Sequence, residues 1–133
     1  MPKRRKKHII KRSGFEDTFT LKLQKENVQF TYESDKIRYV EPEKTRTYTP
    51  DFFLTKKDGS IMIIETKGRW TVSDRQKMKL IKEQFPDLDI RMLFQRNNPI
   101  RKGSKTKYGD YCDKIGLRWA VDSLPSEWKQ ELK

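Results

Sequence analysis

Hydrophobic residues recur with helical spacing in two long segments, residues 13–27 and 73–85. Within each segment they fall three or four positions apart, so one face of a helix would be apolar. Serines open both segments, Ser13 and Ser73, and serine is a favoured N-cap residue; Glu16 follows Ser13 as in a capping box. The sequence therefore predicts two amphipathic helices. Their apolar positions are Phe15, Phe19 and Leu23 in the first and Met78, Ile81 and Phe85 in the second.

Two further helices are predicted in the last third of the chain. One covers residues 108–115 with apolar residues at i, i+3, i+4 and i+7, and Gly116 directly after it is a typical helix end. A shorter helix is predicted over residues 125–132. The apolar residues of the longer one are Tyr108, Tyr111, Cys112 and Ile115.

Segments rich in β-branched and aromatic residues, which are typical of strands, lie between the helices. Residues 28–33 and 36–40 flank a Ser-Asp turn and predict a hairpin. Residues 47–54 and 60–67 predict a second hairpin around a Lys-Lys-Asp-Gly turn. Later strands are predicted at residues 88–94 and 117–121, and residues 41–46 are predicted to be a polar connector.

The predicted order is one helix, four strands, and then helix, strand, helix, strand and helix. We expect an α/β fold, a mixed α+β sheet flanked by helices. A chain of 133 residues suits one domain, which we place at residues 13–133, with residues 1–12 as an N-terminal arm. Only 33% of the residues are hydrophobic and 38% are charged, so a single chain would have a small core. Oligomerisation is therefore worth considering.

The chain is strongly basic, with 31 Lys and Arg against 19 Asp and Glu and a net charge of +12. Such an excess favours a polyanionic partner, either nucleic acid or an anionic membrane. No apolar run approaches the ~20 residues that span a bilayer, and the start of the chain lacks the apolar core of a signal peptide. We expect a soluble, intracellular protein that does not enter a membrane.

Basic residues are densest in the arm, residues 1–12, which holds seven Lys and Arg and no acid. Self-repulsion predicts that the arm is disordered in isolation. A nucleic-acid contact is the favoured role; a solvated tail and a fortuitous nuclear-import-like run are the alternatives. The residues assigned to DNA binding, in the arm and in a later basic loop, are Lys3, Arg4, Arg5, Lys6, Lys7, Lys11, Arg12, Arg101, Lys102, Lys105 and Lys107.

Only one cysteine, Cys112, and one histidine, His8, are present. An internal disulfide, a His/Cys zinc site and any triad that uses histidine are therefore excluded. Helical spacing assigns Cys112 to the core, and Trp70 and Trp119 are interpreted as packing residues rather than platforms for stacked bases. Catalysis, if any, must use carboxylates, lysines and a hard metal.

Charged residues stand at the end of a very hydrophobic predicted strand in "YTPDFFLTKKDGSIMIIETKGRW", residues 48–70. Glu65 and Lys67 are two apart, so they share one face of the strand while Thr66 points to the other. Asp51 lies on the partner strand, opposite or diagonal to Glu65 and within roughly 5 to 8 Å of it. The proline before Asp51 predicts a bulge or edge that turns this side chain.

Two carboxylates this close repel unless a positive charge lies between them. With oxygen ligands only, the expected ion is Mg²⁺ or Mn²⁺. Such an ion polarises a phosphate and lowers the pKa of bound water, and Lys67 would orient that water or neutralise developing charge. The pattern predicts phosphodiester hydrolysis. Chance occurrence, a Glu65–Lys67 ion pair and a purely capping role for Glu16 are the alternatives.

Six segments of the chain resemble the bacteriophage endonuclease I family, the Holliday-junction resolvases of T-odd phages. The segments are "RSGFED", "TYTPDFFL", "IIETKGRW", "SDRQKMKLIKEQFPDLDIRMLF", "KGSKTKYGDYC" and "LPSEW". They come in the order and approximate spacing of that family, from about Ser13 to Glu131.

The resemblance implies a PD-(D/E)XK nuclease fold, also called restriction-endonuclease-like, in an intertwined, domain-swapped homodimer. It implies an endodeoxyribonuclease that cuts four-way and other branched DNA with Mg²⁺, for which Mn²⁺ substitutes. Residues 41–48 would form the bridge between subunits. If the chain is of phage origin, it would act in the cytoplasm of the infected host cell.

The resemblance also implies a role for each site residue. Asp51 and Glu65 would bind the metal together with the backbone carbonyl of Thr66, and Lys67 would be the catalytic lysine. Glu16 would be the fourth catalytic residue and a further candidate metal ligand, supplied by the partner chain. A two-fold dimer would present two equivalent sites for the paired cuts that a junction needs. A sequence-specific restriction-type nuclease and a nucleic-acid-binding protein without catalysis stay open as alternatives.

Overall fold

Seven strands and four helices make up the part of the chain that the computed structural model describes, residues 14–41 and 44–133. The strands are β1 (Phe30–Tyr32), β2 (Ile37–Glu41), β3 (Lys44–Tyr48), β4 (Phe52–Thr55), β5 (Ile61–Lys67), β6 (Ile90–Phe94) and β7 (Arg118–Val121). The helices are α2 (Gly14–Lys25), α3 (Val72–Gln84), α4 (Tyr108–Ile115) and α5 (Ser126–Gln130). The arm, residues 1–12, lies outside the described residues.

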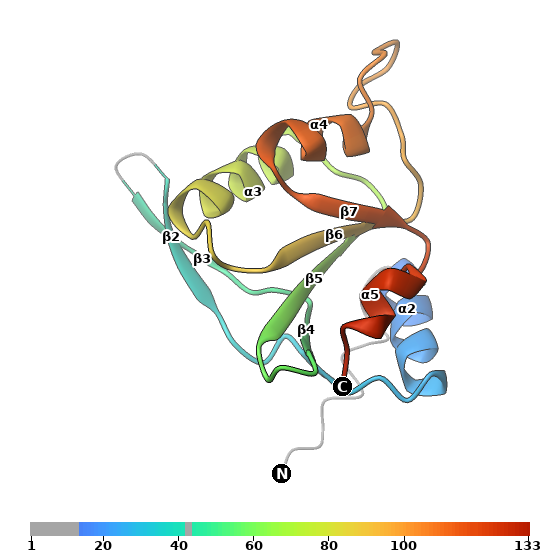
Figure 1. The fold of residues 1–133 in the computed structure, drawn as a ribbon. Coiled ribbons are helices and arrows are strands. Elements are labelled where there is room, and N and C mark those ends of the chain that lie inside the picture. Colours follow the sequence, from blue (N-terminus) through green and yellow to red (C-terminus); the bar gives the residue numbers. More distant parts are fainter. Residues whose placement is uncertain (1–13, 42–43) are drawn as a thin grey trace.

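The central sheet has five strands in the order β1-β4-β5-β6-β7. The pairs β1–β4 and β4–β5 are antiparallel, while β5–β6 and β6–β7 are parallel, so the sheet is mixed as predicted. Helices α3 and α4 lie on one side of it and α2 and α5 on the other (Figure 1). The strands β2 and β3 pair only with each other and form a separate ribbon.

The sheet divides the hydrophobic core into two halves. Phe15, Phe19 and Leu23 of α2 pack with the β5 residue Ile64 in one half. The next residue back along β5, Ile63, belongs to the other half, since neighbouring strand residues point to opposite faces. The predicted apolar face of α2 and the burial of β5 on both sides are thus confirmed. The second half also holds Met78, Ile81, Ile90, Met92, Cys112 and Trp70.

The predicted hairpin between residues 28–33 and 36–40 is wrong. β1 pairs with β4 instead, in a register that sets Tyr32 opposite Phe52. The ring centres of Tyr32 and Phe52 are 5.2 Å apart, and Phe30 packs against Phe52 as well. Burial of these aromatic rings outweighs the local turn signal, because apolar area removed from water contributes more than a two-residue turn.

Residues 41–46 are also not the plain connector that was predicted. They include the end of β2 and the start of β3, and Glu41 pairs with Arg46 across the ribbon at 3.0 Å. Cross-strand pairs hold the polar face of this ribbon, while Tyr39 and Tyr48 on it are buried in the second half of the core. The predicted strand 47–54 is two strands, β3 and β4, separated at residues 49–51.

Helix boundaries differ from the prediction at α3. The helix is capped by Thr71, not Ser73: the Thr71 hydroxyl accepts from the Asp74 N–H, and the Asp74 carboxylate accepts from the Thr71 N–H. Phe85 is the C-cap residue and is 37% exposed, so its predicted place on the buried face of the helix is wrong. Gly116 ends α4 with φ 79°, as predicted. Ser13 lies outside the described residues.

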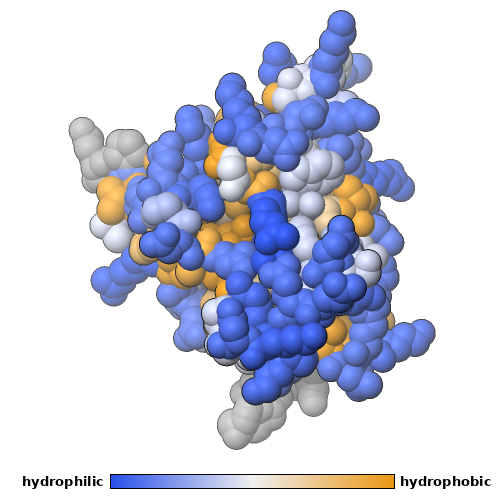
Figure 2. Space-filling view, viewed as in Figure 1, coloured by the Kyte–Doolittle hydropathy of each residue, from blue (hydrophilic) through white to orange (hydrophobic). Residues whose placement is uncertain are grey.

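Packing roles predicted for single residues are confirmed. Trp70 and Cys112 are buried, and Trp119 stacks over Gly109 while its indole N–H donates to Asp113. The face seen in Figure 2 is largely hydrophilic, with hydrophobic residues showing in patches. Among the described residues, no helix is both long and apolar enough to cross a membrane.

Candidate active site

Two acids meet where β4 begins and β5 ends. Phe52 pairs with Ile64, so Asp51, one residue earlier, lies beside Glu65, one residue later. The backbone N–H of Asp51 donates to Glu65 Oε1 at 3.4 Å. Both residues are buried, with only 7% and 5% of their surface exposed. The juxtaposition predicted from the hairpin is confirmed.

Glu65 is held by a tyrosine that the sequence did not indicate. The hydroxyl of Tyr48 donates to Glu65 Oε1 at 2.7 Å. Burial, followed by the negative charge of Asp51, raises the pKa of Glu65 to about 8. Burial and the neighbouring Glu65 charge also raise the pKa of Tyr48 well above its usual value. The positive charges near Glu65 therefore do not offset its burial and the charge of Asp51.

Asp51 is held by Thr66 through two hydrogen bonds. Asp51 Oδ2 accepts from the Thr66 backbone N–H at 3.0 Å and from its hydroxyl at 2.9 Å. Burial raises the pKa of Asp51, although these bonds and the charge of Lys67 oppose the rise. Thr66 lies on the other strand face from Glu65, as predicted, yet its hydroxyl still reaches the site because Asp51 lies in the bend before β4.

Lys67 points toward the start of α3. Its Nζ is 3.5 Å from Oδ1 of Asp74, the acid that also caps this helix. Partial burial works to raise the pKa of Asp74, but the hydrogen bond from Thr71 and the Lys67 charge hold it below its ordinary value. Within the described residues, the ion pair of Lys67 is with Asp74 and not with Glu65. A Glu65–Lys67 ion pair, the alternative interpretation, is therefore not found.

Two more acids lie close to Asp51. One carboxylate oxygen each of Glu16, Glu33 and Asp51 lies within 4.8 Å of the others. Glu16 comes from α2 of the same chain, and the Tyr32 hydroxyl donates to it at 2.8 Å. The single chain thus already brings Glu16 beside Asp51.

Glu33 was missed by the sequence reasoning. Its position follows from β1 pairing with β4, because the Glu33 N–H donates to the Asp51 carbonyl at 3.0 Å. Its sequence signal was an acid at the end of the predicted strand 28–33, and the wrong partner assigned to that strand hid its position.

The residues present fit a hard divalent cation. Carboxylate oxygens of Glu16, Glu33 and Asp51 meet here, with Glu65 beside the Asp51 backbone, and such oxygens suit Mg²⁺ or Mn²⁺. Burial raises the pKa of both Asp51 and Glu65, so their charged forms are costly without a cation, and a bound cation would favour those charged forms. Candidate ligands are Asp51, Glu65, Glu16 and Glu33.

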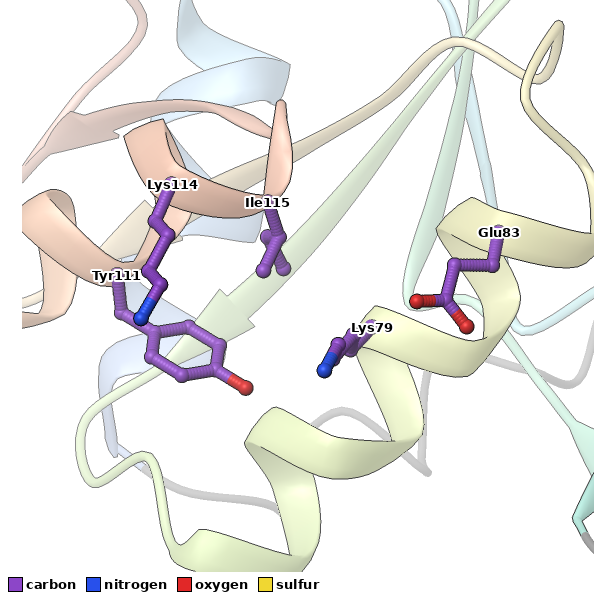
Figure 3. Close-up of a pocket in the computed structure, with 5 residues that line it drawn as sticks. All are labelled: Lys79, Glu83, Tyr111, Lys114 and Ile115. Carbon is purple, nitrogen blue, oxygen red and sulfur yellow. The ribbon is translucent and has the colours of Figure 1, made fainter.

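A separate pocket of about 330 Å³ lies between α3 and α4 (Figure 3). Neither the three clustered acids nor Glu65 lines it. Its walls carry two lysines and one acid, so it lacks the carboxylate group described above. The lining residues are Lys79, Glu83, Tyr111, Lys114 and Ile115.

The basic loop before α4 is exposed, and its DNA contacts stay a prediction. Arg101, Lys102, Lys105 and Lys107 all have exposed side chains. The seven basic residues of the arm that were assigned the same role lie outside the described residues.

A family model described as phage endonuclease I matches residues 1–133. The chain belongs to this family. It is 43% identical over 123 residues to Endonuclease I of Escherichia phage T7, covering 92% of this chain and 80% of that protein. It is 42% identical over 123 residues to Endodeoxyribonuclease 1 of Enterobacteria phage T3, covering 92% of this chain and 78% of that protein. The family resemblance expected from the six segments is confirmed.

Proposed function

We propose that this protein is a metal-dependent DNA endonuclease that resolves four-way (Holliday) and other branched junctions by phosphodiester hydrolysis. The observation that carries the proposal is the buried pair of Asp51 and Glu65, with Lys67 beside it, in a chain of the phage endonuclease I family. A fully buried acid pair without a cation is costly, which supports a role in binding one.

Each residue has a distinct proposed task. Asp51 and Glu65 hold Mg²⁺, or Mn²⁺ in its place, with the Thr66 carbonyl, Glu16 and Glu33 as further ligands. When bound, the ion polarises the phosphate and makes a bound water more acidic. Lys67, held at the edge of the site by Asp74, orients the attacking water or neutralises charge on the phosphate.

The fold supports a PD-(D/E)XK core within this proposal. Asp51 and the Glu65-x-Lys67 pair supply the pattern for which that superfamily is named. Asp51 directly precedes β4, and Glu65 and Lys67 lie at the end of the adjacent strand β5 of a mixed sheet, with α2 and α3 on opposite faces of it.

We place the active enzyme in a domain-swapped homodimer with residues 41–48 as the bridge. In the single chain, the β2–β3 ribbon connects the unit α2–β1 to the rest of the sheet. Opening the ribbon would let that unit, with Glu16, pair with β4 of a second copy. Each site would then combine Glu16 of one chain with Asp51 of the other.

A mixing experiment tests whether Glu16 acts in its own chain or in the partner. Glu16→Gln and Asp51→Asn chains are each inactive and are refolded together. In swapped mixed dimers one site has both acids intact, so junction nicking returns. If Glu16 serves its own chain, every site lacks one acid, and the mixture stays inactive.

The central test of the proposal is a cleavage assay on a four-way junction and on a linear duplex of the same sequence, with Mg²⁺ or with EDTA. We expect paired cuts in the junction with Mg²⁺ only. A preferred site on linear duplex would favour a restriction-type nuclease instead. Binding without cleavage of either substrate would favour a binding protein.

Phosphate contacts are expected to supply most of the affinity, with little base readout. Deleting residues 1–12, which hold seven basic residues, should weaken junction binding and flatten the dependence of log affinity on log salt. An unchanged slope would show that the arm makes no contact. The enzyme would act in the cytoplasm of an infected host cell.

A further inference from the structure

Two tyrosine hydroxyls each contact one of the glutamates of the site. Tyr48, the last residue of β3, donates to Glu65 at 2.7 Å, and Tyr32, the last residue of β1, donates to Glu16 at 2.8 Å. In both cases the acceptor is Oε1. Asp51 lies between the two, since it follows β3 and immediately precedes Phe52, which pairs with Tyr32.

The rings that carry these hydroxyls are held in place. Tyr48 is 1% exposed, and Nζ of Lys77 on α3 lies 5.1 Å from its ring centre. The ring centre of Tyr32 is 5.2 Å from that of Phe52, whose own side chain is fully buried. Neither hydroxyl can therefore swing far from its glutamate.

A fixed donor at one oxygen limits how a carboxylate turns about its terminal bond. The second oxygen of the same group is then aimed in one direction, and a carboxylate has acceptor sites on both oxygens. Groups that orient metal ligands in this way often control metal affinity as strongly as the ligands do.

We propose that Tyr48 and Tyr32 are positioning residues that orient Glu65 and Glu16 and thereby set the affinity of the site for divalent cations. The inference rests on the proposed function, because it needs a metal to bind at these glutamates. It holds with or without a domain swap. Tyr32 and Glu16 both precede the proposed bridge, residues 41–48, and Tyr48, its last residue, leads directly to β4, which pairs with β5 and its Glu65, so each pair stays together.

The test is Mn²⁺ binding to DNA-free protein, followed by electron paramagnetic resonance, for wild type, Tyr48→Phe and Tyr32→Phe. Tyr39→Phe is the matched control, since Tyr39 is a buried tyrosine on the neighbouring strand β2. We expect the half-saturating Mn²⁺ concentration to rise about 10-fold or more for Tyr48→Phe. A smaller rise is expected for Tyr32→Phe, because Tyr32 is only half-buried and water can replace its hydroxyl.

Thermal denaturation in EDTA separates positioning from simple structural support. A structural role alone would lower the melting temperature and leave Mn²⁺ half-saturation unchanged, which would overturn the inference. Tyr48→Phe and Tyr32→Phe affect different glutamates, so if one variant does not fold, the other still tests the inference. A wild-type protein that binds no Mn²⁺ would overturn the proposed metal site as well. Normal wild-type binding with unshifted variants overturns the inference alone.

Discussion

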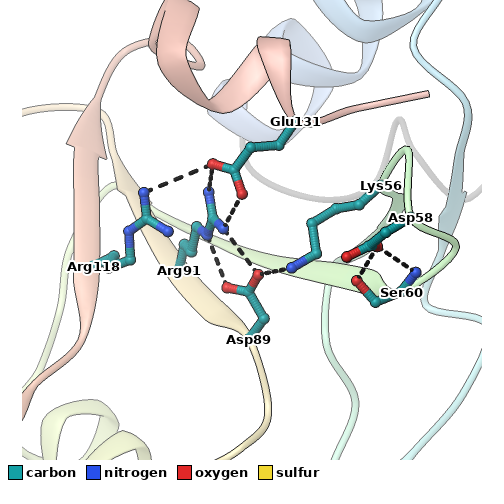
Figure 4. A network of polar contacts seen from close by, with 7 residues as sticks. All are labelled: Lys56, Asp58, Ser60, Asp89, Arg91, Arg118 and Glu131. Carbon is teal, nitrogen blue, oxygen red and sulfur yellow. Dashed lines mark hydrogen bonds and ion pairs between the residues drawn. The ribbon is translucent and has the colours of Figure 1, made fainter.

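Two groups of buried charge lie on the same sheet, and they are built in opposite ways. Around Arg91 of β6, each acid has a basic partner: the guanidinium donates to both oxygens of Asp89 and both of Glu131 at 2.8 to 2.9 Å (Figure 4). Lys56 adds a second partner for Asp89 at 2.7 Å. Around Asp51 and Glu65, the acids face each other.

The contrast separates structural charge from functional charge. The Arg91 network attaches the end of the chain to the sheet, since Glu131 follows α5 and the ring of Trp128 in that helix lies 5.1 Å from the guanidinium. Paired buried charges of this kind hold elements together. Within the described residues, Asp51 and Glu65 form no ion pair, and an acid pair of this kind costs stability and is kept where a ligand supplies positive charge.

The largest effect should come from the acid pair and its lysine. Asp51→Asn, Glu65→Gln and Lys67→Ala should each lower junction cleavage with Mg²⁺ by about 10³-fold or more, because each removes charge used in the reaction. Binding to the junction in EDTA should be largely unchanged. Single-turnover cleavage and gel-shift titration measure the two quantities.

Asp58→Asn is the matched control, because Asp58 is an exposed acid in the turn between β4 and β5. Its cleavage rate should equal that of wild type. If cleavage survives in all three site variants, the assignment of the site is wrong.

Breaking the Arg91 network should lower the stability of the fold without changing metal binding. Arg91→Met leaves two acids facing an apolar side chain and should lower the free energy of unfolding by about 3 kcal/mol, measured by urea denaturation. Arg118→Met, at the exposed edge of the same network, should cost less than about 1 kcal/mol. Mn²⁺ binding by folded Arg91→Met should match that of wild type. Loss of Mn²⁺ binding in this variant would contradict the separation between the Arg91 network and the acid pair.

The sequence predicted contacts between residues close together in the chain, but not contacts between residues far apart. Asp51, Glu65 and Lys67 were placed correctly because a short hairpin and the two-residue strand period fix their positions. Arg91 was predicted only as part of a buried strand. Its partner Glu131 is 40 positions away, and no local pattern relates them.

Errors in the fold had the same origin. The apolar face of α2 and the end of α4 at Gly116 are local features, and both predictions were confirmed. The partner of β1 is β4, which only tertiary burial of aromatic rings decides. Because the partner of β1 was predicted wrongly, the position of Glu33 was missed. The roles of Tyr32 and Tyr48 also depend on contacts between strands and helices that are distant in the sequence.

Melting temperatures of the metal-free protein, measured across a pH series, should reveal the cost of ionising Glu65. The pKa of Glu65 in the folded state, about 8, lies above its ordinary value of 4.5. Protonated Glu65 therefore stabilises the fold fully below pH 4.5, and this contribution is lost as the pH rises through 8. Gln keeps an acceptor for Tyr48 and carries no charge.

In EDTA at pH 8.5, Glu65→Gln should melt about 4 °C or more above wild type, and the difference should shrink toward pH 5. Mg²⁺ should raise the melting temperature of wild type and close the gap. A constant difference across this pH range would show that Glu65 is not the group responsible.

Calorimetric titration of Mg²⁺ into DNA-free protein at pH 8 tests most directly whether the acid pair is a cation site. Saturable binding is predicted for wild type and for folded Arg91→Met, and none for Asp51→Asn. Equal Mg²⁺ binding by wild type and Asp51→Asn, or no Mg²⁺ binding by wild type, would show that the acid pair is not a cation site.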